Sequence, residues 1–329
     1  MLWLLLLSCG RSTPGEDSDA NAPDDTDVLD SDSDTDVTDT DSDTDADTDT
    51  TEPFDCATLP ALPRPFEVLE GLYASEDFCF DDEGHLISHY IDSLVKQEYP
   101  PGAVEPFAPT AGGPGGPASM RTLPTGDLVY ANVDTSSLYL VTMEGGSTPV
   151  FGAFGYPTGI DIHPSGAVFA ADIDGVIKID PYLENVEVII GAGVLRFPNG
   201  ITFSEDFSTL YLGTMEGIFS VPVDADGTAT AAPSLWASIP GNGEMLGMGV
   251  DACGNVYGLV DGTTLVRYPS VGGSPEIVMS VPPGAWMTNL QWGSGIGGWD
   301  DRKIYITDRQ LTTPAYYEVD VGVPAKFYW

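Results

Sequence analysis

Pro157-Thr158-Gly159-Ile160 and Pro198-Asn199-Gly200-Ile201 follow one pattern, and each begins a short apolar stretch. The second residues of these two motifs are 41 positions apart. Four further stretches match the pattern more loosely, and successive second positions lie 42, 40, 41, 47 and 42 residues apart. In chain order these six positions are Glu76, Ala118, Thr158, Asn199, Leu246 and Thr288. A recurrence of about 40 to 50 residues, with several strands in each unit, is typical of a β-propeller.

The repeats predict an all-β fold, a six-bladed β-propeller over residues 54–329. This range holds 276 residues, or 46 for each of six units, which leaves no room for a second domain. Short β-branched and aromatic runs between turns, such as Leu210-Tyr211-Leu212, predict the strands. We expect Phe66–Glu70 to pair with the strands near Val319 and close the ring. The innermost strands of a propeller start around one channel, so the six second positions should face one another there.

The chain is strongly acidic, with a formal net charge of −40. Residues 16–52 contain 15 Asp and 2 Glu and no Lys or Arg. Since residues 10–53 offer almost no apolar surface to bury, we predict a disordered, extended acidic linker. Regularly spaced Asp also occurs in calcium loops, but those need a Gly for the tight turn, and the run from Asp30 to Asp49 has none. An acidic surface of this kind excludes nucleic acid as a partner.

The N-terminal residues predict a lipid anchor in a membrane. Met1–Ser8 is mostly apolar and far too short to span a bilayer as a helix. Leu6-Leu7-Ser8-Cys9 is similar to a bacterial lipobox, in which the Cys is acylated and becomes the mature N-terminus. We therefore interpret residues 1–9 as the remnant of a lipoprotein signal, with Cys9 as the lipidation site. Gly10 is typical of lipoproteins sent to the outer membrane, so we expect a periplasmic or surface-exposed protein of the cell envelope.

With Cys9 acylated, three cysteines remain in an oxidising compartment, and any one pairing leaves a free thiol. Cys79 lies in a predicted innermost strand, which favours a small buried side chain. Cys56 in the leader and Cys253 in a hairpin turn are more accessible. The sequence therefore favours a Cys56–Cys253 disulfide and leaves the other pairings open.

Several motifs resemble those of the SMP-30/gluconolactonase/LRE-like propellers and occur in the order found in that family. Pro198-Asn199-Gly200-Ile201-Thr202-Phe203-Ser204-Glu205-Asp206, followed by Leu210-Tyr211-Leu212, is similar to the hallmark of the family. Residues 76–86 are similar to its opening Glu motif, and residues 247–257 and 288–307 to its later blades. The resemblance covers about residues 66–325. Propellers with NHL-like repeats share much of this pattern and are the nearest structural alternative.

The resemblance implies a divalent-cation site at the channel mouth, with Ca²⁺ or Zn²⁺ as the cofactor. Members with lactonase activity bind the cation through a Glu from the first unit, Asn residues from middle units and an Asp from the fifth. Glu76 and Asn199 match two of these positions, and Thr158 offers a hydroxyl oxygen where an Asn is expected. Leu246 stands where the Asp is expected and can neither bind a cation nor act as a general base. We expect Glu244, two residues earlier, to lie in the preceding loop and outside the site.

With this incomplete ligand set, Glu76 is equally interpreted as a channel carboxylate that hydrogen-bonds to backbone amides or water. His85 and His89 have no Cys nearby and do not predict a zinc site. Side chains of the fifth and sixth units are candidates for binding a ligand rather than a metal. These ligand-binding candidates are Leu246, Trp286, Thr288 and Asn289.

The sequence therefore predicts a membrane-anchored propeller that binds a small molecule or a protein at the channel mouth, with a degenerate metal site. A divalent-metal-dependent lactonase or esterase is the alternative. The third hypothesis for the function is a purely structural domain.

Overall fold

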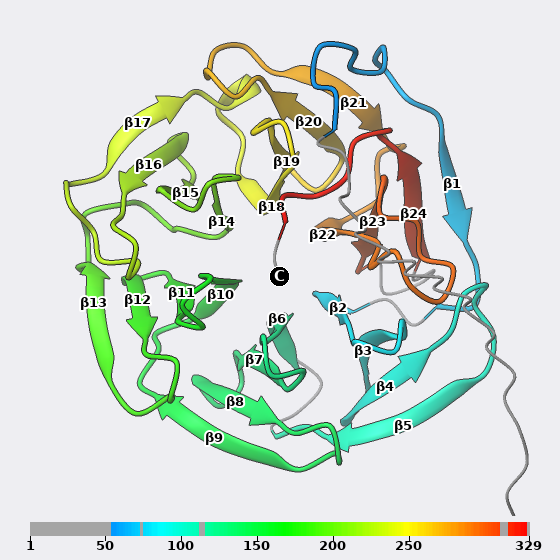
Figure 1. The fold of residues 1–329 in the computed structure, drawn as a ribbon, viewed down its shortest axis with the longest axis vertical. Coiled ribbons are helices and arrows are strands. Elements are labelled where there is room, and N and C mark those ends of the chain that lie inside the picture. Colours follow the sequence, from blue (N-terminus) through cyan, green and yellow to red (C-terminus); the bar gives the residue numbers. More distant parts are fainter. Residues whose placement is uncertain (1–53, 73–74, 112–115, 310–314, 328–329) are drawn as a thin grey trace, which may run out of the picture. The chain divides into compact units, whose positions relative to one another are not determined.

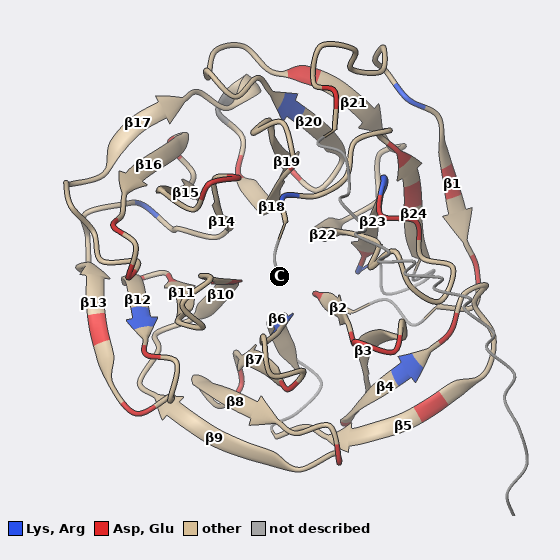
Figure 2. Ribbon diagram, in the orientation of Figure 1, with Lys and Arg blue, Asp and Glu red and all other residues tan. Residues whose placement is uncertain are grey.

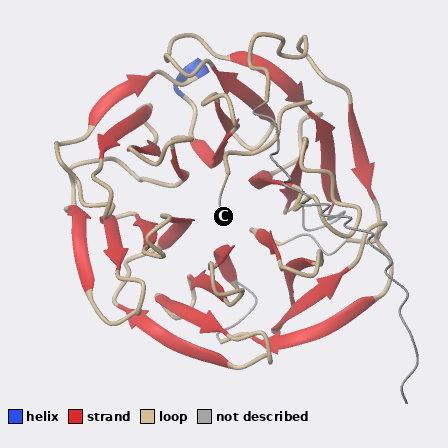
Figure 3. Cartoon of the chain, viewed as in Figure 1, coloured by secondary structure: helices blue, strands red, loops and turns tan. Residues whose placement is uncertain are grey.

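The computed structural model describes residues 54–72, 75–111, 116–309 and 315–327. Their strands form six four-stranded sheets arranged as the blades of a ring, which confirms the predicted all-β six-bladed propeller (Figure 1). Among the described residues, the one helical element is the short 3-10 turn η1 (Pro240–Asn242), and all other regular elements are strands (Figure 3). The predicted signal remnant 1–9, its lipidation site Cys9 and the predicted acidic linker 10–53 lie outside the described residues. Among the residues described, no helix is long and apolar enough to cross a bilayer.

Each blade runs from an innermost to an outermost strand, antiparallel throughout. From the innermost to the outermost strand, the first blade contains β2 (Phe78–Phe80), β3 (Leu86–Tyr90), β4 (Ser93–Gln97) and β5 (Val104–Pro109). The second blade contains β6 (Pro117–Thr122), β7 (Leu128–Asn132), β8 (Ser137–Val141) and β9 (Ser147–Gly152). The third blade contains β10 (Pro157–Ile162), β11 (Val168–Asp172), β12 (Gly175–Ile179) and β13 (Val186–Ile190). The last three blades, in the same order, are β14 (Ile201–Phe203), β15 (Thr209–Gly213), β16 (Ile218–Pro222) and β17 (Ser234–Ala237); β18 (Met245–Val250), β19 (Val256–Val260), β20 (Thr264–Tyr268) and β21 (Glu276–Ser280); β22 (Met287–Trp292), β23 (Lys303–Asp308), β24 (Ala315–Asp320) and β1 (Phe66–Leu69).

The ring closes between the two ends of the described chain. β1 pairs antiparallel with β24, and Phe66 lies opposite Val319, as expected from the sequence. The N-terminal strand is therefore the outermost strand of the last blade, so the sixth sheet contains residues from both ends of the propeller. This pairing covers the outer edge of β24 and makes β1 the edge strand of the sixth blade.

Apolar side chains fill the space between neighbouring blades. One of the buried clusters combines Phe169 of β11 with Phe203 of β14, whose rings meet edge to face with centroids 4.9 Å apart. The innermost strands approach one another so closely that their glycines are required. A Cβ on Gly159 would overlap the Asn199 carbonyl oxygen, and one on Gly200 would overlap the Leu246 carbonyl oxygen. The Gly of the repeated motif is thus explained by packing around the channel.

Buried polar side chains tie the first blade to the second and the second blade to the third. Asp77 accepts hydrogen bonds from the Met120 amide (2.8 Å) and the Ser119 hydroxyl (2.9 Å) of the second blade. The Ser119 hydroxyl oxygen in turn accepts from the Ile160 amide of the third blade (3.0 Å). Arg121 adds an ion pair to Asp77 at 2.8 Å. Asp77 is fully buried, and this burial raises the pKa of its carboxyl group while Arg121 opposes the rise.

The C-terminal tail crosses the channel at the end where the innermost strands finish (Figure 1). The Lys326 amide donates to the Val250 carbonyl oxygen of β18 (2.9 Å). The Lys326 ammonium is completely buried and contacts Asp161 of β10 (2.8 Å) and the Phe203 carbonyl oxygen of β14 (3.0 Å). Burial lowers the pKa of Lys326, and the Asp161 carboxylate opposes that shift. The tail therefore links the third, fourth and fifth blades at one face, here called the floor.

A disulfide fixes the leader to this floor. Cys56 and Cys253 are joined, the pairing that the sequence favours, and 197 residues separate them. Cys253 lies in the turn that follows β18, at the floor end of that strand. Cys79 is a buried free thiol in β2. In the chain-entropy model, closing a loop of this length stabilises the fold by about 5 kcal/mol.

Candidate functional site

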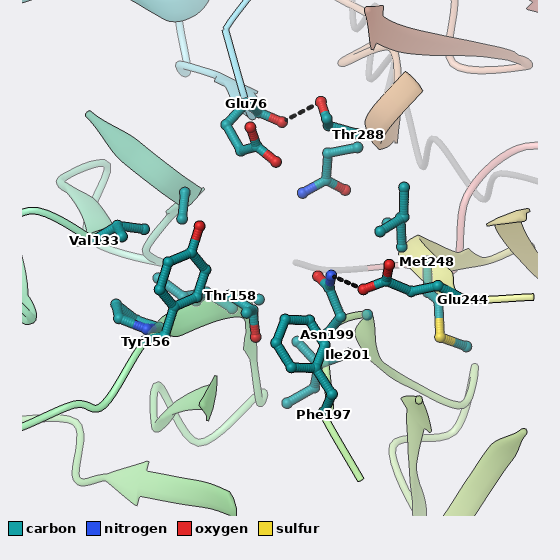
Figure 4. A pocket seen from close by; sticks show the side chains of 18 of the residues that line it. Glu76, Val133, Tyr156, Thr158, Phe197, Asn199, Ile201, Glu244, Met248 and Thr288 are labelled. Carbon is teal, nitrogen blue, oxygen red and sulfur yellow. Dashed lines mark hydrogen bonds between the residues drawn. The ribbon is translucent and has the colours of Figure 1, made fainter. Parts of the chain in front are cut away.

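The starts of the innermost strands surround a cavity of about 410 Å³ at the face opposite the floor (Figure 4). All six second positions of the repeats contribute to its wall. The other two ligand-binding candidates, Trp286 and Asn289, line it as well. The structure thus brings together every predicted metal and ligand residue of the propeller around one opening, here called the mouth.

Glu76 enters the mouth just before β2 and forms an ion pair with Arg309, which directly follows β23. The Thr288 hydroxyl donates to the Glu76 carbonyl oxygen at 2.7 Å and so holds the first blade against the sixth. Burial raises the pKa of the Glu76 carboxyl group, and Arg309 opposes that rise. The nearby carboxylate of Glu244 raises this pKa further.

Glu244 reaches the mouth, contrary to the sequence-based expectation. It lies in the loop before β18, as expected, but its side chain lines the cavity and accepts a hydrogen bond from the Asn199 amide nitrogen at 3.2 Å (Figure 4). Two hydrogen bonds to Asp261 hold this loop: the Glu244 amide donates to the Asp261 carboxylate (2.9 Å), and the Asp261 amide donates to the Glu244 carbonyl oxygen (3.1 Å). A loop position therefore supplies the carboxylate that Leu246 cannot.

The remaining predicted residues are held by contacts of their own. The Thr158 hydroxyl donates to the Pro198 carbonyl oxygen at 2.9 Å, which joins the third and fourth blades beside Asn199. Leu246 is buried in an apolar cluster and forms an apolar part of the wall. The Asn289 side-chain oxygen accepts from the Leu290 amide at 2.8 Å. Thr158 and Asn289 each keep an oxygen with a further lone pair, whereas Leu246 offers no polar atom on its side chain.

Aromatic side chains stand around the entrance. Trp286 and Tyr156 are 48% and 43% exposed although both line the cavity, and Phe197 lines it with a backbone φ of 53°. The other tryptophans of this region are structural: Trp299 is fully buried against Phe80, and the Trp292 ring nitrogen donates to a carbonyl oxygen near the floor. The entrance thus has apolar rings at its edge and carboxylates inside.

A second group of side chains of the types that bind metals lies at the floor end of the first blade. Asp81, Glu83 and His85 bring their ligand atoms within 4.8 Å of one another. Lys96 already contacts this group, with its ammonium 2.8 Å from Asp81, and His85 lies 2.9 Å from the same carboxylate. Because Lys96 supplies positive charge, this cluster is a weaker candidate for a cation than the mouth.

Sequence reasoning missed Arg309, Arg121 and the position of Glu244. Neither arginine occupies a repeated position, and Arg309 lies just before the undescribed residues 310–314. Nothing in the sequence around Asp308-Arg309 indicated that the Arg309 guanidinium would turn toward Glu76.

No protein-family model and no curated protein matches this chain. Several solved structures match this chain in fold. A gluconolactonase from Xanthomonas campestris matches with a TM-score of 0.63 at 16% identity, covering 79% of this chain and 89% of that one. A calcium-binding regucalcin from Agrobacterium tumefaciens matches with a TM-score of 0.64 at 18% identity, covering 80% and 96%. A chain of a nidogen–laminin complex matches with a TM-score of 0.58 at 15% identity, covering 72% and 89%.

These similarities show that the chain has the six-bladed propeller fold of gluconolactonase- and regucalcin-like proteins. At such identities they show the fold alone. The same architecture occurs in a gluconolactonase, in a calcium-binding protein and in a nidogen–laminin complex, so function has to be argued from the mouth itself.

Proposed function

We propose that the mouth hydrolyses a lactone or a related carboxylic ester with the help of a divalent cation. The observation that carries this proposal is the contact between Glu244 and Asn199 inside the cavity that Glu76 also lines. The presence of Leu246 where an Asp is expected argued against hydrolysis, because the fifth unit then has no carboxylate at its repeated position. Glu244 restores a carboxylate to that side of the mouth.

The donor set suits a hard cation. Glu76 and Glu244 offer carboxylate oxygens, Thr158 offers a hydroxyl, and Asn199 keeps its amide oxygen because it donates to Glu244 through the nitrogen. Two carboxylates offset the charge of a divalent ion, and water fills further positions of a Ca²⁺ shell. None of the described residues that line the mouth is His or Cys. Since Zn²⁺ favours nitrogen and sulfur ligands, Ca²⁺ is the better match.

A bound cation would polarise the ester carbonyl and stabilise the negative charge that develops on its oxygen. Glu244 is the candidate general base: its carboxylate accepts a proton from the attacking water. The hydrogen bond from Asn199 orients Glu244 toward the cavity. As the ring carbon–oxygen bond breaks, the proton on Glu244 passes to the leaving alkoxide, which gives a hydroxy acid. Trp286 and Tyr156 can pack on the apolar face of the substrate and reduce access of bulk water.

The direct test is turnover of a lactone panel. We expect at least one five- or six-membered lactone to be hydrolysed faster than its spontaneous rate when Ca²⁺ is present, because the mouth then combines a cation with a base. Acid release in a weakly buffered indicator solution measures the rate. A chelator should abolish the rate and added Ca²⁺ should restore it. A panel without any turnover above background would overturn the hydrolase proposal.

Binding without catalysis is the second candidate, and one observation favours it. Glu76 already has a cationic partner in Arg309, so the mouth is partly neutralised without a metal. In this case the aromatic edge and polar wall would hold a small molecule or a protein segment. Ligand binding that a chelator leaves unchanged, together with an inactive lactone panel, would support this second reading.

We further propose that Cys9 carries a lipid and that residues 10–53 tether the propeller to a membrane of the cell envelope. Cys56 follows this segment closely in the sequence, and its disulfide holds it at the floor, at the opposite end of β18 from Leu246 and the mouth. The acidic residues spread around the ring, with few Lys or Arg among them, fit a domain kept off an anionic surface (Figure 2).

Replacing Cys9 with Ser should move the protein from the membrane fraction to the soluble fraction, because lipidation requires the Cys sulfur. The measurement is an immunoblot of fractions from bacterial cells that produce the chain. Ser12→Ala is the control, since it changes the same segment and keeps the sulfur. Equal recovery of the Cys9→Ser protein with membranes would contradict the tether proposal.

A further inference from the structure

The mouth contains a cation of its own. The Arg309 guanidinium contacts the Glu76 carboxylate, the group that the proposed function assigns to a divalent ion. Eleven Lys and Arg residues stand against 51 Asp and Glu in this chain, so one of few cationic side chains is placed at this carboxylate. A metal ion and the Arg309 guanidinium would compete for the same Glu76 carboxylate, because each is stabilised by its negative charge.

The backbone of Arg309 is fixed, whereas its side chain is not buried. The Arg309 amide donates to the Trp286 carbonyl oxygen (3.0 Å), and the Trp286 amide donates to the Asp308 carboxylate (2.8 Å). These bonds hold the root of the side chain at the edge of the mouth. The Arg309 side chain is 45% exposed and that of Glu76 is 26% exposed.

This difference in exposure decides which partner can move. Arg309 can turn into solvent and be hydrated there, so release of its guanidinium leaves no buried charge behind. Glu76 is the more enclosed of the two and needs a cationic partner, because burial disfavours its ionised form. The pair is therefore arranged so that one cation can replace another at Glu76.

We propose that Arg309 is a built-in competitor of the divalent cation for Glu76, and that it sets the affinity of the mouth for Ca²⁺. This inference rests on the proposed cation site. With Arg309 on Glu76 the mouth is in a resting state; with Ca²⁺ on Glu76, Asn199 and Glu244 the guanidinium is displaced to the rim beside Trp286. The affinity for Ca²⁺ is reduced by the free energy needed to break the ion pair.

Calorimetric titration of the full chain with Ca²⁺ tests this competition. Arg309→Gln should bind Ca²⁺ roughly fivefold more tightly than the wild type, the effect expected for loss of a partly exposed ion pair worth about 1 kcal/mol. Arg309→Lys keeps the charge and should resemble the wild type. Arg302→Gln removes an exposed positive charge elsewhere and controls for the change in net charge.

The acidic residues outside the propeller can bind Ca²⁺ weakly, so each titration is repeated in a Glu76→Gln background. There, Arg309→Gln should have no effect, because its partner is gone. Equal affinities of the wild type and Arg309→Gln, or weaker binding by Arg309→Gln, would overturn the competition and leave the cation site standing. If no Ca²⁺ binding depends on Glu76 in either chain, the cation site itself is wrong and the inference falls with it.

Discussion

Replacing Glu244 with Gln should lower lactone turnover by about 10²–10⁴-fold, the usual contribution of a general base. Gln has nearly the same shape and can still accept the hydrogen bond from Asn199, but it cannot take a proton from water. We expect kcat to fall more than the affinity for substrate changes, because the apolar edge of the mouth is untouched. Initial rates on the most active lactone of the panel measure both parameters.

The matched control is Glu184→Gln, an exposed Glu in the turn between β12 and β13, remote from the mouth. It should retain wild-type turnover and wild-type melting temperature. A Glu244→Gln protein that hydrolyses lactones at the wild-type rate would show that Glu244 is not the base. The mouth would then be interpreted as a ligand-binding site that lacks a general base in its fifth unit.

Replacing Asp77 with Ala should lower the free energy of unfolding by about 3–5 kcal/mol, because the change leaves the charge of Arg121 without its buried partner. It also removes the acceptor of the Met120 amide and the Ser119 hydroxyl. These contacts join the first and second blades, so their loss should loosen the ring at that junction. Urea denaturation followed by tryptophan fluorescence provides the measurement.

Asp301→Ala provides the control, because Asp301 is exposed and lies at the edge of the sixth blade. Its effect should stay within about 0.5 kcal/mol. Asp77→Asn keeps a hydrogen-bond acceptor and lacks the charge, so an intermediate loss is expected. If Asp77→Ala unfolds at the wild-type urea concentration, the ion pair with Arg121 does not hold these blades together.

The fold and the repeated positions that line the channel mouth could be predicted from the sequence. The repeated motif has a physical reason: Gly159 and Gly200 are needed because neighbouring innermost strands nearly touch, and the residue before each Gly points into the mouth. A side chain at a repeated position has its place fixed by the symmetry of the ring. Thr158 and Asn199 could therefore be assigned to one opening from their spacing alone.

Residues outside the repeat could not be placed in this way. Glu244 lies in a loop whose path depends on hydrogen bonds to the carboxylate and the backbone amide of Asp261, and these bonds have no periodic pattern in the sequence. Arg309 follows the end of a strand, where the direction of a long side chain is set by its charged neighbour Glu76. Lys326 was missed for a similar reason, since nothing in the sequence indicated that the C-terminal tail would enter the channel.

We propose that Glu76, Asn199 and Glu244 hold one divalent cation at the mouth. A crystal structure of the protein grown with Ca²⁺, with anomalous scattering used to locate the ion, tests this directly. We expect one ion with oxygen atoms of all three residues about 2.3–2.6 Å away and Arg309 turned toward solvent. A mouth without an ion, in which Arg309 still contacts Glu76 at saturating Ca²⁺, would contradict it.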